Sequence, residues 1–365
     1  MLKIKTKGNR FYGEVFVMSV VSLNDFGAVF LSPTLSFFND SLAKNTQEDD
    51  KLFFLAREGY WLERSYTAYT KAKGRKPNSA YMLVSRAFLF KIGLMQPKTW
   101  SYSLNFAYED TLYNLMKNRF MLSDANIFQI FTEIELEEKL ELPKDIAKIE
   151  AIFLAKQPQF NSLLHATYEA YKSYLHSIDF FSAERVNLVD IGYSGTIQAL
   201  LSTIFEKDTV GHYLIASKPG VRKENGQTIE CKGYLKEGFK MNEGYVPLDR
   251  SMILESLLTA PVGQFQNISV NVLDKQKFDF YYGRKVASQH QFYIIEAIMK
   301  GAINRMVLNA QTLTEFEPHE VESLLSAFMT KKGMIPSSSW PIFEIDDDTA
   351  NEGTLNTLNF WGIKA

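Results

Sequence analysis

Short apolar runs, each followed by a segment with helical periodicity, recur along the chain. Four of these runs predict buried strands, at Leu52–Ala56, Tyr81–Val84, Val186–Ile191 and His212–Ala216. Helical patterns follow three of them, at Glu58–Tyr69, through Phe88 and Phe90, and at Thr196–Phe205. Strands separated by helices indicate crossover connections and a parallel or mixed sheet.

The rest of the pattern is mainly helical. Between the second and third predicted strands, apolar side chains recur every three or four residues from Phe160 to Leu175, which is typical of a helix face. Further helices are predicted at Gln289–Met306 and at His319–Met329, the latter after Pro318. We therefore expect an α/β, Rossmann-like fold with helices on both faces of the sheet and a helix-rich insertion. The whole chain, 1–365, would be one catalytic unit with a helical subdomain around 95–180.

Composition narrows the classes of ligand. The net charge is −2 and there is no run of Lys and Arg, which argues against broad electrostatic binding to nucleic acid. The single cysteine, Cys231, forms no internal disulfide and no Cys/His zinc cluster, as expected in a reducing compartment. The apolar stretch Val15–Leu23 is too short to span a bilayer. We expect a cytoplasmic protein, peripheral at the inner face of the membrane where it docks on an assembly.

The strongest local motif joins the third predicted strand to its helix. The strand ends in Asp190, and Gly192-Tyr193-Ser194-Gly195-Thr196 follows. Glycines allow a sharp turn, and the N–H groups at the start of a helix, together with the two hydroxyls, can hold an anion. Asp190 would meet a ribose hydroxyl or a metal ion. The alternative is an ordinary turn in which Ser194 or Thr196 only caps the helix.

Two other strands also deliver charged side chains at their ends. The first is followed by Arg57, Glu58 and Gly59, and the second by Ser85 and Arg86. The planar guanidinium group matches phosphate oxygens, whereas an ion pair at a helix start is the simpler explanation for Arg57 and Glu58. Because parallel strands share one carboxyl edge, all these side chains are predicted to face one pocket.

A fourth segment places an acidic residue on an apolar helix before Pro261. Glu255 is costly in such surroundings unless it is paired, so it is expected either to pair with an arginine of the site or to lie exposed.

Together, the four segments resemble the glycan phosphoribosyltransferase domain of bacterial polysaccharide ribofuranosyltransferases. The resemblance covers about residues 20–350 and rests on Leu55–Gly59, Ser85–Ala87, Asp190–Thr196, Glu255–Gly263 and the tail His319–Asp346.

The resemblance implies an enzyme of surface-polysaccharide (O-antigen or capsule) biosynthesis. It would move a 5-phosphoribosyl group from phosphoribosyl diphosphate to a lipid-linked glycan. Its partners would be a haloacid-dehalogenase-type phosphatase, which removes the 5-phosphate, and other glycosyltransferases of polysaccharide assembly. The phosphatase signature Asp-x-Asp-Gly-Thr is absent from this sequence, so the chain resembles the transferase alone. The family pattern has Asp, Arg and Trp where this chain has Glu58, Ala87 and Tyr193.

These observations predict roles for the motif residues. Arg57 and Arg86 would neutralise phosphate, and the Gly192–Thr196 turn would hold a phosphate through its N–H groups. Asp190 would bind ribose hydroxyls or Mg²⁺, or would act as the base, with Glu58 as the competing base. Mg²⁺ is expected as a cofactor because it commonly bridges diphosphate oxygens with few protein ligands.

Three other functions fit parts of the pattern. A nucleotide-sugar glycosyltransferase would also use arginines and a glycine-containing turn. A methyltransferase would hold S-adenosylmethionine on the Asp190–Gly195 segment, but that site needs no neighbouring arginines. A non-catalytic scaffold of a polysaccharide assembly complex would bind no donor at all.

Overall fold

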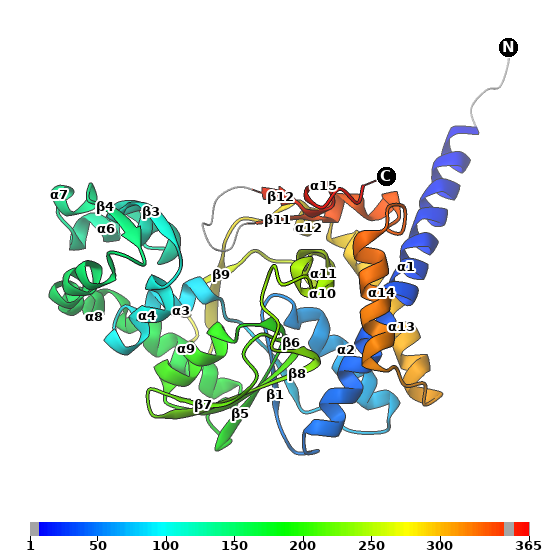
Figure 1. Cartoon of the computed structure of the whole chain (residues 1–365), viewed down its shortest axis with the longest axis horizontal. Helices are drawn as coiled ribbons and strands as arrows, with labels where there is room; N and C mark the ends of the chain where they lie inside the picture. The colour runs from blue at the N-terminus through cyan, green and yellow to red at the C-terminus, as the bar shows by residue number, and fades with distance from the viewer. Residues whose placement is uncertain (1–6, 347–353, 365) are drawn as a thin grey trace, which may run out of the picture.

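A computed structural model describes residues 7–346 and 354–364. Its central feature, within those residues, is a six-stranded sheet in the order β2-β1-β5-β6-β8-β7 (Figure 1). All neighbouring strands are parallel except β7 and β8, which are antiparallel. The strands are β1 (Leu52–Leu55), β2 (Ser79–Met82), β5 (Arg185–Tyr193), β6 (Asp208–Ala216), β7 (Gly220–Glu224) and β8 (Gln227–Glu237). The predicted α/β, Rossmann-like class with a mixed sheet is confirmed.

The central strands are apolar on both faces because helices cover both faces. In β1, Leu52 and Phe54 belong to one buried cluster, whereas Phe53 and Leu55 belong to another. Successive side chains of a strand point to opposite faces, so a strand buried on both sides reads as a continuous apolar run. This is why LFFL was recognisable as a strand from the sequence.

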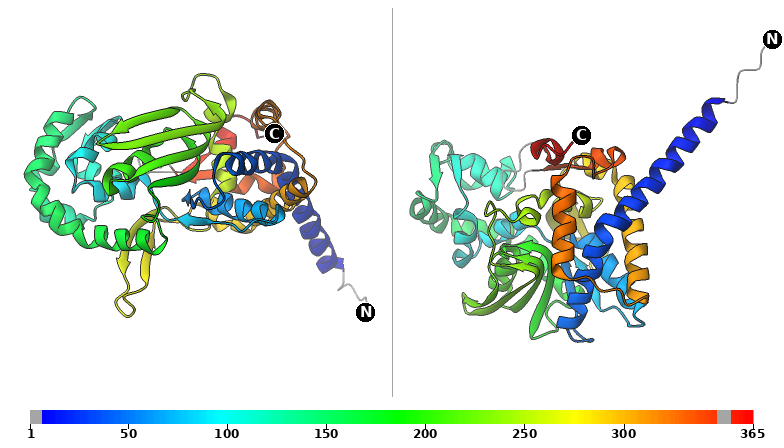
Figure 2. Two further views of the ribbon diagram at one scale, coloured as in Figure 1. Left: turned by 90° about the horizontal axis from the view of Figure 1, so that it is seen from below. Right: turned by 45° about the vertical axis from the view of Figure 1, so that its right-hand side comes forward.

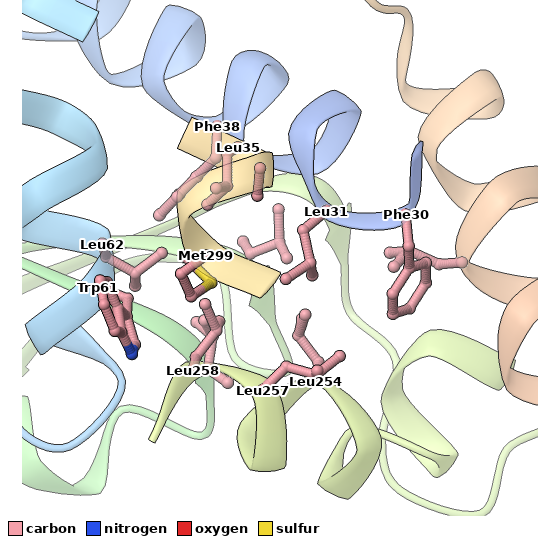
Figure 3. Close-up of a cluster of buried hydrophobic side chains, with 14 of the residues drawn as sticks. Phe30, Leu31, Leu35, Phe38, Trp61, Leu62, Leu254, Leu257, Leu258 and Met299 are labelled. Atoms are coloured by element: carbon pink, nitrogen blue, oxygen red, sulfur yellow. The ribbon is translucent and has the colours of Figure 1, made fainter. Parts of the chain in front are cut away.

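One face of the sheet packs against helices from the two ends of the chain. These are α1 (Lys7–Asn45), α2 (Gly59–Ala72), α11 (Met252–Leu258), α13 (Phe292–Gln311) and α14 (Pro318–Thr330). Figure 3 shows their side chains meeting, with Leu31 and Leu35 from α1, Leu62 from α2, Leu257 from α11 and Met299 from α13. The face of α11 formed by Leu254, Leu257 and Leu258 points into this cluster, which anchors the helix that carries Glu255.

Helices α1 and α13 approach one another through reciprocal glycines. A Cβ atom at Gly27 would lie 1.8 Å from the Ile298 carbonyl oxygen, and one at Gly301 would lie 1.9 Å from the Asn24 carbonyl oxygen. Neither position can therefore carry a side chain at this helix separation.

The start of α1 extends beyond the body of the protein (Figures 1 and 2). No helix in the described part of the chain combines the length and the apolar character needed to cross a membrane.

The other face of the sheet packs against α3 (Arg86–Gly93), α8 (Ile146–Ser177) and α9 (Thr196–Phe205). Between α3 and β5 lies the predicted helix-rich insertion, which forms the left side of Figure 1. Besides α8 it contains α4 (Trp100–Leu104), α5 (Leu112–Asn114), a π-helical turn (Leu115–Arg119), α6 (Asp124–Ile130), α7 (Glu133–Leu136) and the ribbon β3 (Tyr108–Thr111) with β4 (Lys139–Leu142).

The remaining elements are a second two-stranded ribbon and several short helices, turns and strands. A second ribbon, β9 (Phe265–Val270) with β10 (Phe278–Tyr282), packs on α8 and projects from the body (Figure 2). The others are α10 (Val246–Asp249), α12 (Ala287–His290), β11 (Glu344–Asp346), β12 (Thr354–Asn356), α15 (Thr357–Phe360) and two 3₁₀ turns (Pro97–Thr99 and Ser337–Ile342).

Some predicted elements differ in the structure. The polar, turn-rich segment Lys218–Gln227, which by its composition resembles a loop, contains β7 and the turn into β8. At that turn Asn225 and Gly226 have φ values of 52° and 92°, the left-handed conformation that Asn-Gly favours in hairpins. The second predicted strand lies two residues earlier, as Ser79–Met82, and the apolar stretch Val15–Leu23 belongs to α1.

The strand order places a switch point between β1 and β5. From β1 the chain continues outward through α2 to β2, whereas β5, β6 and β8 extend the sheet on the other side. Connections at such a point leave in opposite directions and open a crevice at the carboxyl ends of the strands. Arg57, Arg86 and Asp190 all lie at these ends.

Candidate active site

The end of β1 presents two charged side chains. The buried strand ends at Leu55, and Arg57 and Glu58 follow before α2 begins at Gly59. The main-chain N–H of Arg57 donates to Glu58 Oε2 at 3.3 Å. Gly59, predicted to contact substrate, does not line the cavity described below. It packs on β1, where a Cβ atom would lie 2.6 Å from the Phe54 carbonyl carbon, so its role is to let α2 approach the strand.

The end of β2 combines a helix cap with a cation. Ser85 caps α3: its Oγ accepts from the Phe88 N–H at 3.1 Å and donates to the Phe265 carbonyl oxygen at 2.6 Å. Both bonds are internal, so this hydroxyl holds α3 against β9 as well as lying at the cavity wall. The guanidinium carbon of Arg86 lies 5.3 Å from the centre of the Phe106 ring, a cation–π contact with the insertion.

The turn after β5 owes its shape to two glycines with positive φ. Gly192 has φ 144°, and a Cβ atom there would lie 2.3 Å from the Ile215 carbonyl oxygen on β6. Gly195 has φ 70° and is the N-cap residue of α9, with no side-chain cap. The hydroxyls of Ser194 and Thr196 lie 3.0 Å apart instead. The simpler expectation, that one of these hydroxyls caps the helix, is therefore wrong.

These segments line one cavity of about 550 Å³ at the carboxyl edge of the sheet. All the predicted site residues except Gly59 line it: Arg57, Glu58, Ser85, Arg86, Asp190, Gly192, Tyr193, Ser194, Gly195, Thr196 and Glu255. The predicted convergence of separate strand ends on one pocket is thus present. Glu255 reaches the cavity from α11, on the side opposite the leucines that anchor that helix.

Asp190 lies among other carboxyl groups in this cavity. Its Oδ1 accepts from the Ile191 N–H at 2.8 Å. Desolvation raises the pKa of Asp190 well above its usual range, and the nearby charges of Glu58 and Glu255 raise it further. The hydrogen bonds from the N–H groups of Ile191 and Gly192 oppose this shift. A carboxylate with a raised pKa is a stronger proton acceptor than an ordinary aspartate.

A buried polar network supports the turn from below. Gln198 on α9 is fully buried; its Oε1 accepts from Tyr213 Oη at 2.8 Å and from Cys231 Sγ at 3.1 Å. Its Nε2 donates to Thr209 Oγ1 at 3.1 Å and to the Glu230 carbonyl oxygen at 2.9 Å. The bonds join α9 to β6 and β8, so Gln198 fixes the first turns of α9 under the cavity.

Several residues that line the cavity were not predicted from the sequence. Lys218 follows β6 and Lys240 follows β8, so two more strand ends carry a cation beside the cavity. The rule that pointed to Arg57 applies equally to the predicted strand before Lys218. Phe106 comes from the insertion, where Arg119 donates to the carbonyl oxygens of Ser103, Phe106 and Ala107 at 3.0–3.1 Å. No local pattern in the sequence predicts that long-range placement.

The residues do not form a protein metal cage. Within 7–346 and 354–364, no group of three or more His, Cys, Asp or Glu side chains is arranged to hold a metal ion. A site with few protein ligands is what Mg²⁺ uses when phosphate oxygens supply most of its coordination. Asp190 and Glu58 are carboxyl groups that line the same cavity as the two arginines and could supply such ligands.

The arrangement combines guanidinium groups, a glycine-containing turn at a helix start and a carboxylate with a raised pKa. Such a cavity can hold a polyanion, stabilise a departing phosphate group and accept a proton. A search of protein-family models finds none that matches the chain, and a search of curated proteins finds no significant match.

Proposed function

We propose that this protein is a phosphoribosyl diphosphate-dependent glycan phosphoribosyltransferase of bacterial surface-polysaccharide biosynthesis. The observation that supports it most is the meeting of Arg57, Arg86, Asp190 and the Gly192–Thr196 turn around one cavity. A donor with several phosphate groups around a ribose needs cations, N–H groups and a carboxylate in one place. The cavity supplies all three from different strand ends.

In the proposed reaction, the bond between C1 of ribose and the diphosphate oxygen breaks, and the diphosphate leaves with the electron pair. The ribosyl centre gains oxocarbenium character, and Arg57 and Arg86 stabilise the charge that develops on the leaving group. An acceptor hydroxyl oxygen forms the new bond to C1. Its proton passes to a carboxylate, Asp190 or Glu58.

The raised pKa of Asp190 favours this residue as the base. Burial and the charges of Glu58 and Glu255 make its ionised form a strong proton acceptor. Asp190 also lines the cavity in which the ribose hydroxyls of the donor would lie. Mg²⁺ bound with the diphosphate would add charge neutralisation beside the arginines. A separate haloacid-dehalogenase-type phosphatase would then remove the 5-phosphate from the lipid-linked glycan.

Direct transfer tests this proposal. The purified protein is incubated with phosphoribosyl diphosphate, Mg²⁺ and a synthetic or lipid-linked glycan; diphosphate release is measured and the glycan is analysed by mass spectrometry. We expect a phosphoribosyl adduct with the wild type and none with Arg57→Ala or Asp190→Ala. Arg75→Ala, at an exposed arginine outside the cavity, is the matched control and should retain activity.

Three results would contradict the proposal. Full turnover in both cavity variants would show that the reaction occurs elsewhere. Release of a nucleotide from a nucleotide-sugar donor, with no consumption of phosphoribosyl diphosphate, would favour the nucleotide-sugar glycosyltransferase. Binding of neither donor would favour the non-catalytic scaffold.

A further inference from the structure

The cations of the cavity form two groups along the sheet edge. Arg86 follows β2 and Arg57 follows β1, whereas Lys218 follows β6 and Lys240 follows β8. In the strand order β2-β1-β5-β6-β8, the first pair lies at one end of the edge and the second pair at the other. All four side chains line the same cavity.

A carboxyl group, that of Asp190, lies between the two cation pairs, and two further carboxyl groups lie near it. Asp190 is on β5, the strand between β1 and β6, and Glu58 and Glu255 act electrostatically on it. Four inter-strand steps of about 4.8 Å separate β2 from β8, roughly 19 Å along the edge. A single anion placed at the centre would meet carboxylates. A ligand with hydroxyls at its centre and an anionic group at each end is complementary to this pattern.

The β6/β8 end also has polar groups suited to phosphate. The Ser217 N–H donates to the Tyr193 carbonyl oxygen at 2.8 Å, which holds Lys218 beside the Gly192–Thr196 turn. There the uncapped, positive end of α9 and the hydroxyls of Ser194 and Thr196 border the cavity. Lysine ammonium groups reinforce such a site because they act as mobile point charges.

The two lysines are available for a ligand. Both are exposed, and neither forms an ion pair with another described residue. Lys218 lies within electrostatic range of Glu224 on β7, and the main-chain N–H of Lys240 donates to Glu243 at 2.8 Å. The ammonium group of Lys240 is thus not consumed by that local turn.

We infer that the cavity has two separate anion subsites, with Lys218 and Lys240 holding the 5-phosphate of the donor. Arg57 and Arg86 hold the diphosphate at the other end, and Asp190 meets the ribose hydroxyls between them. The inference rests on the proposed function, because it assigns the two charged ends of that function's donor. It makes the lysines specificity residues for a phosphorylated ribose over an unphosphorylated one.

Fragments of the donor test the two subsites separately. Binding of ribose 5-phosphate and of inorganic diphosphate is measured by calorimetry for the wild type and for the double variant Lys218→Gln/Lys240→Gln. We expect the double variant to lose about a hundredfold in affinity for ribose 5-phosphate, about tenfold for each charge-assisted contact. Its affinity for diphosphate should remain that of the wild type. Lys223→Gln, at an exposed lysine of β7 outside the cavity, should change neither.

The outcomes separate this inference from the proposed function. Unchanged binding of ribose 5-phosphate by the double variant, or an equal loss for both fragments, would overturn the two-subsite assignment. If the wild type still transfers the phosphoribosyl group in that case, the proposed function stands and only the assignment fails. Absence of donor binding and of transfer in the wild type would remove the proposed function itself.

Discussion

The network around Gln198 predicts that the turn under the cavity depends on one buried amide. In Gln198→Leu the side chain keeps nearly the same volume but loses all its hydrogen bonds. The hydroxyl of Tyr213, a residue that is only 2% exposed, and the Glu230 carbonyl oxygen then lose their hydrogen-bond partner on α9. Because each unsatisfied buried polar group costs about 1–3 kcal/mol, the two together should lower the free energy of unfolding by about 2–6 kcal/mol.

The Gln198→Leu substitution should also weaken the binding of the proposed donor. Loss of the bonds to β6 and β8 releases the first turns of α9, so the Gly192–Thr196 turn is no longer held in one conformation. If the proposed function is correct, the KM for phosphoribosyl diphosphate should rise more than kcat falls. Tyr213→Phe removes one bond but leaves Cys231 Sγ on Gln198 Oε1, so its cost should be about 1 kcal/mol.

Urea denaturation, followed by circular dichroism and extrapolated linearly, measures these changes in stability. Gln129→Leu, at an exposed position of α6, is the matched control and should change the free energy of unfolding by less than about 0.5 kcal/mol. A double-mutant cycle of Gln198→Leu with Tyr213→Phe should show coupling, since the residues share a bond. A loss below about 1 kcal/mol in Gln198→Leu would refute the reasoning.

Three further predictions concern polar groups near the sheet. Burial lowers the pKa of His212 from 6.5 to about 3, so the unfolded chain binds a proton that the folded chain excludes. The neutral imidazole therefore contributes fully to the free energy of unfolding above pH 6.5, and this contribution falls as the pH drops. Unfolding curves at pH 7 and pH 4 should show that the wild type loses about 3 kcal/mol of unfolding free energy by pH 4 and that His212→Gln does not. The pH dependence expected from Asp190 is the opposite, because its raised pKa makes the folded state retain a proton that the unfolded chain releases. The free energy of unfolding of the wild type should therefore decline relative to that of Asp190→Asn as the pH rises above about 4. Parallel pH profiles of the two proteins would contradict this. Ser85→Ala removes the cap of α3 and the bond to Phe265, so urea denaturation should show a loss of about 2 kcal/mol in the free energy of unfolding. An unchanged KM for the proposed donor would show that this hydroxyl serves structure alone.

The sequence reveals the site where local pattern and topology agree. Arg57, Arg86 and Asp190 were predictable because each lies near the carboxyl end of an apolar run or follows it, and parallel strands end at one edge. Ser85 shows the limit of that rule, because a hydroxyl at a strand end can equally cap the next helix. A polar residue type alone does not distinguish the two roles.

Other features depend on information that no short segment carries. The edge strand β7 (Gly220–Glu224) is polar because it is exposed, so it resembles a loop, and only the Asn225-Gly226 turn signalled a hairpin. Phe106 reaches Arg86 because the insertion folds back over the sheet, held by the buried Arg119. Long-range packing of this kind is set by the whole fold.

The glycine crossing of α1 and α13 also constrains the order in which the protein can be completed. Gly27 packs against the backbone of Ile298, and Gly301 packs against that of Asn24, although the two helices come from opposite ends of the chain. During synthesis, α1 emerges from the ribosome long before its partner and must wait with its apolar face uncovered. The β1, β2, β5 and β6 strands can pair before α13 exists, but the face of the sheet under α1 is sealed only when the last quarter of the chain arrives. A nascent chain stalled before Gly301 should therefore bind chaperones that recognise exposed apolar helices.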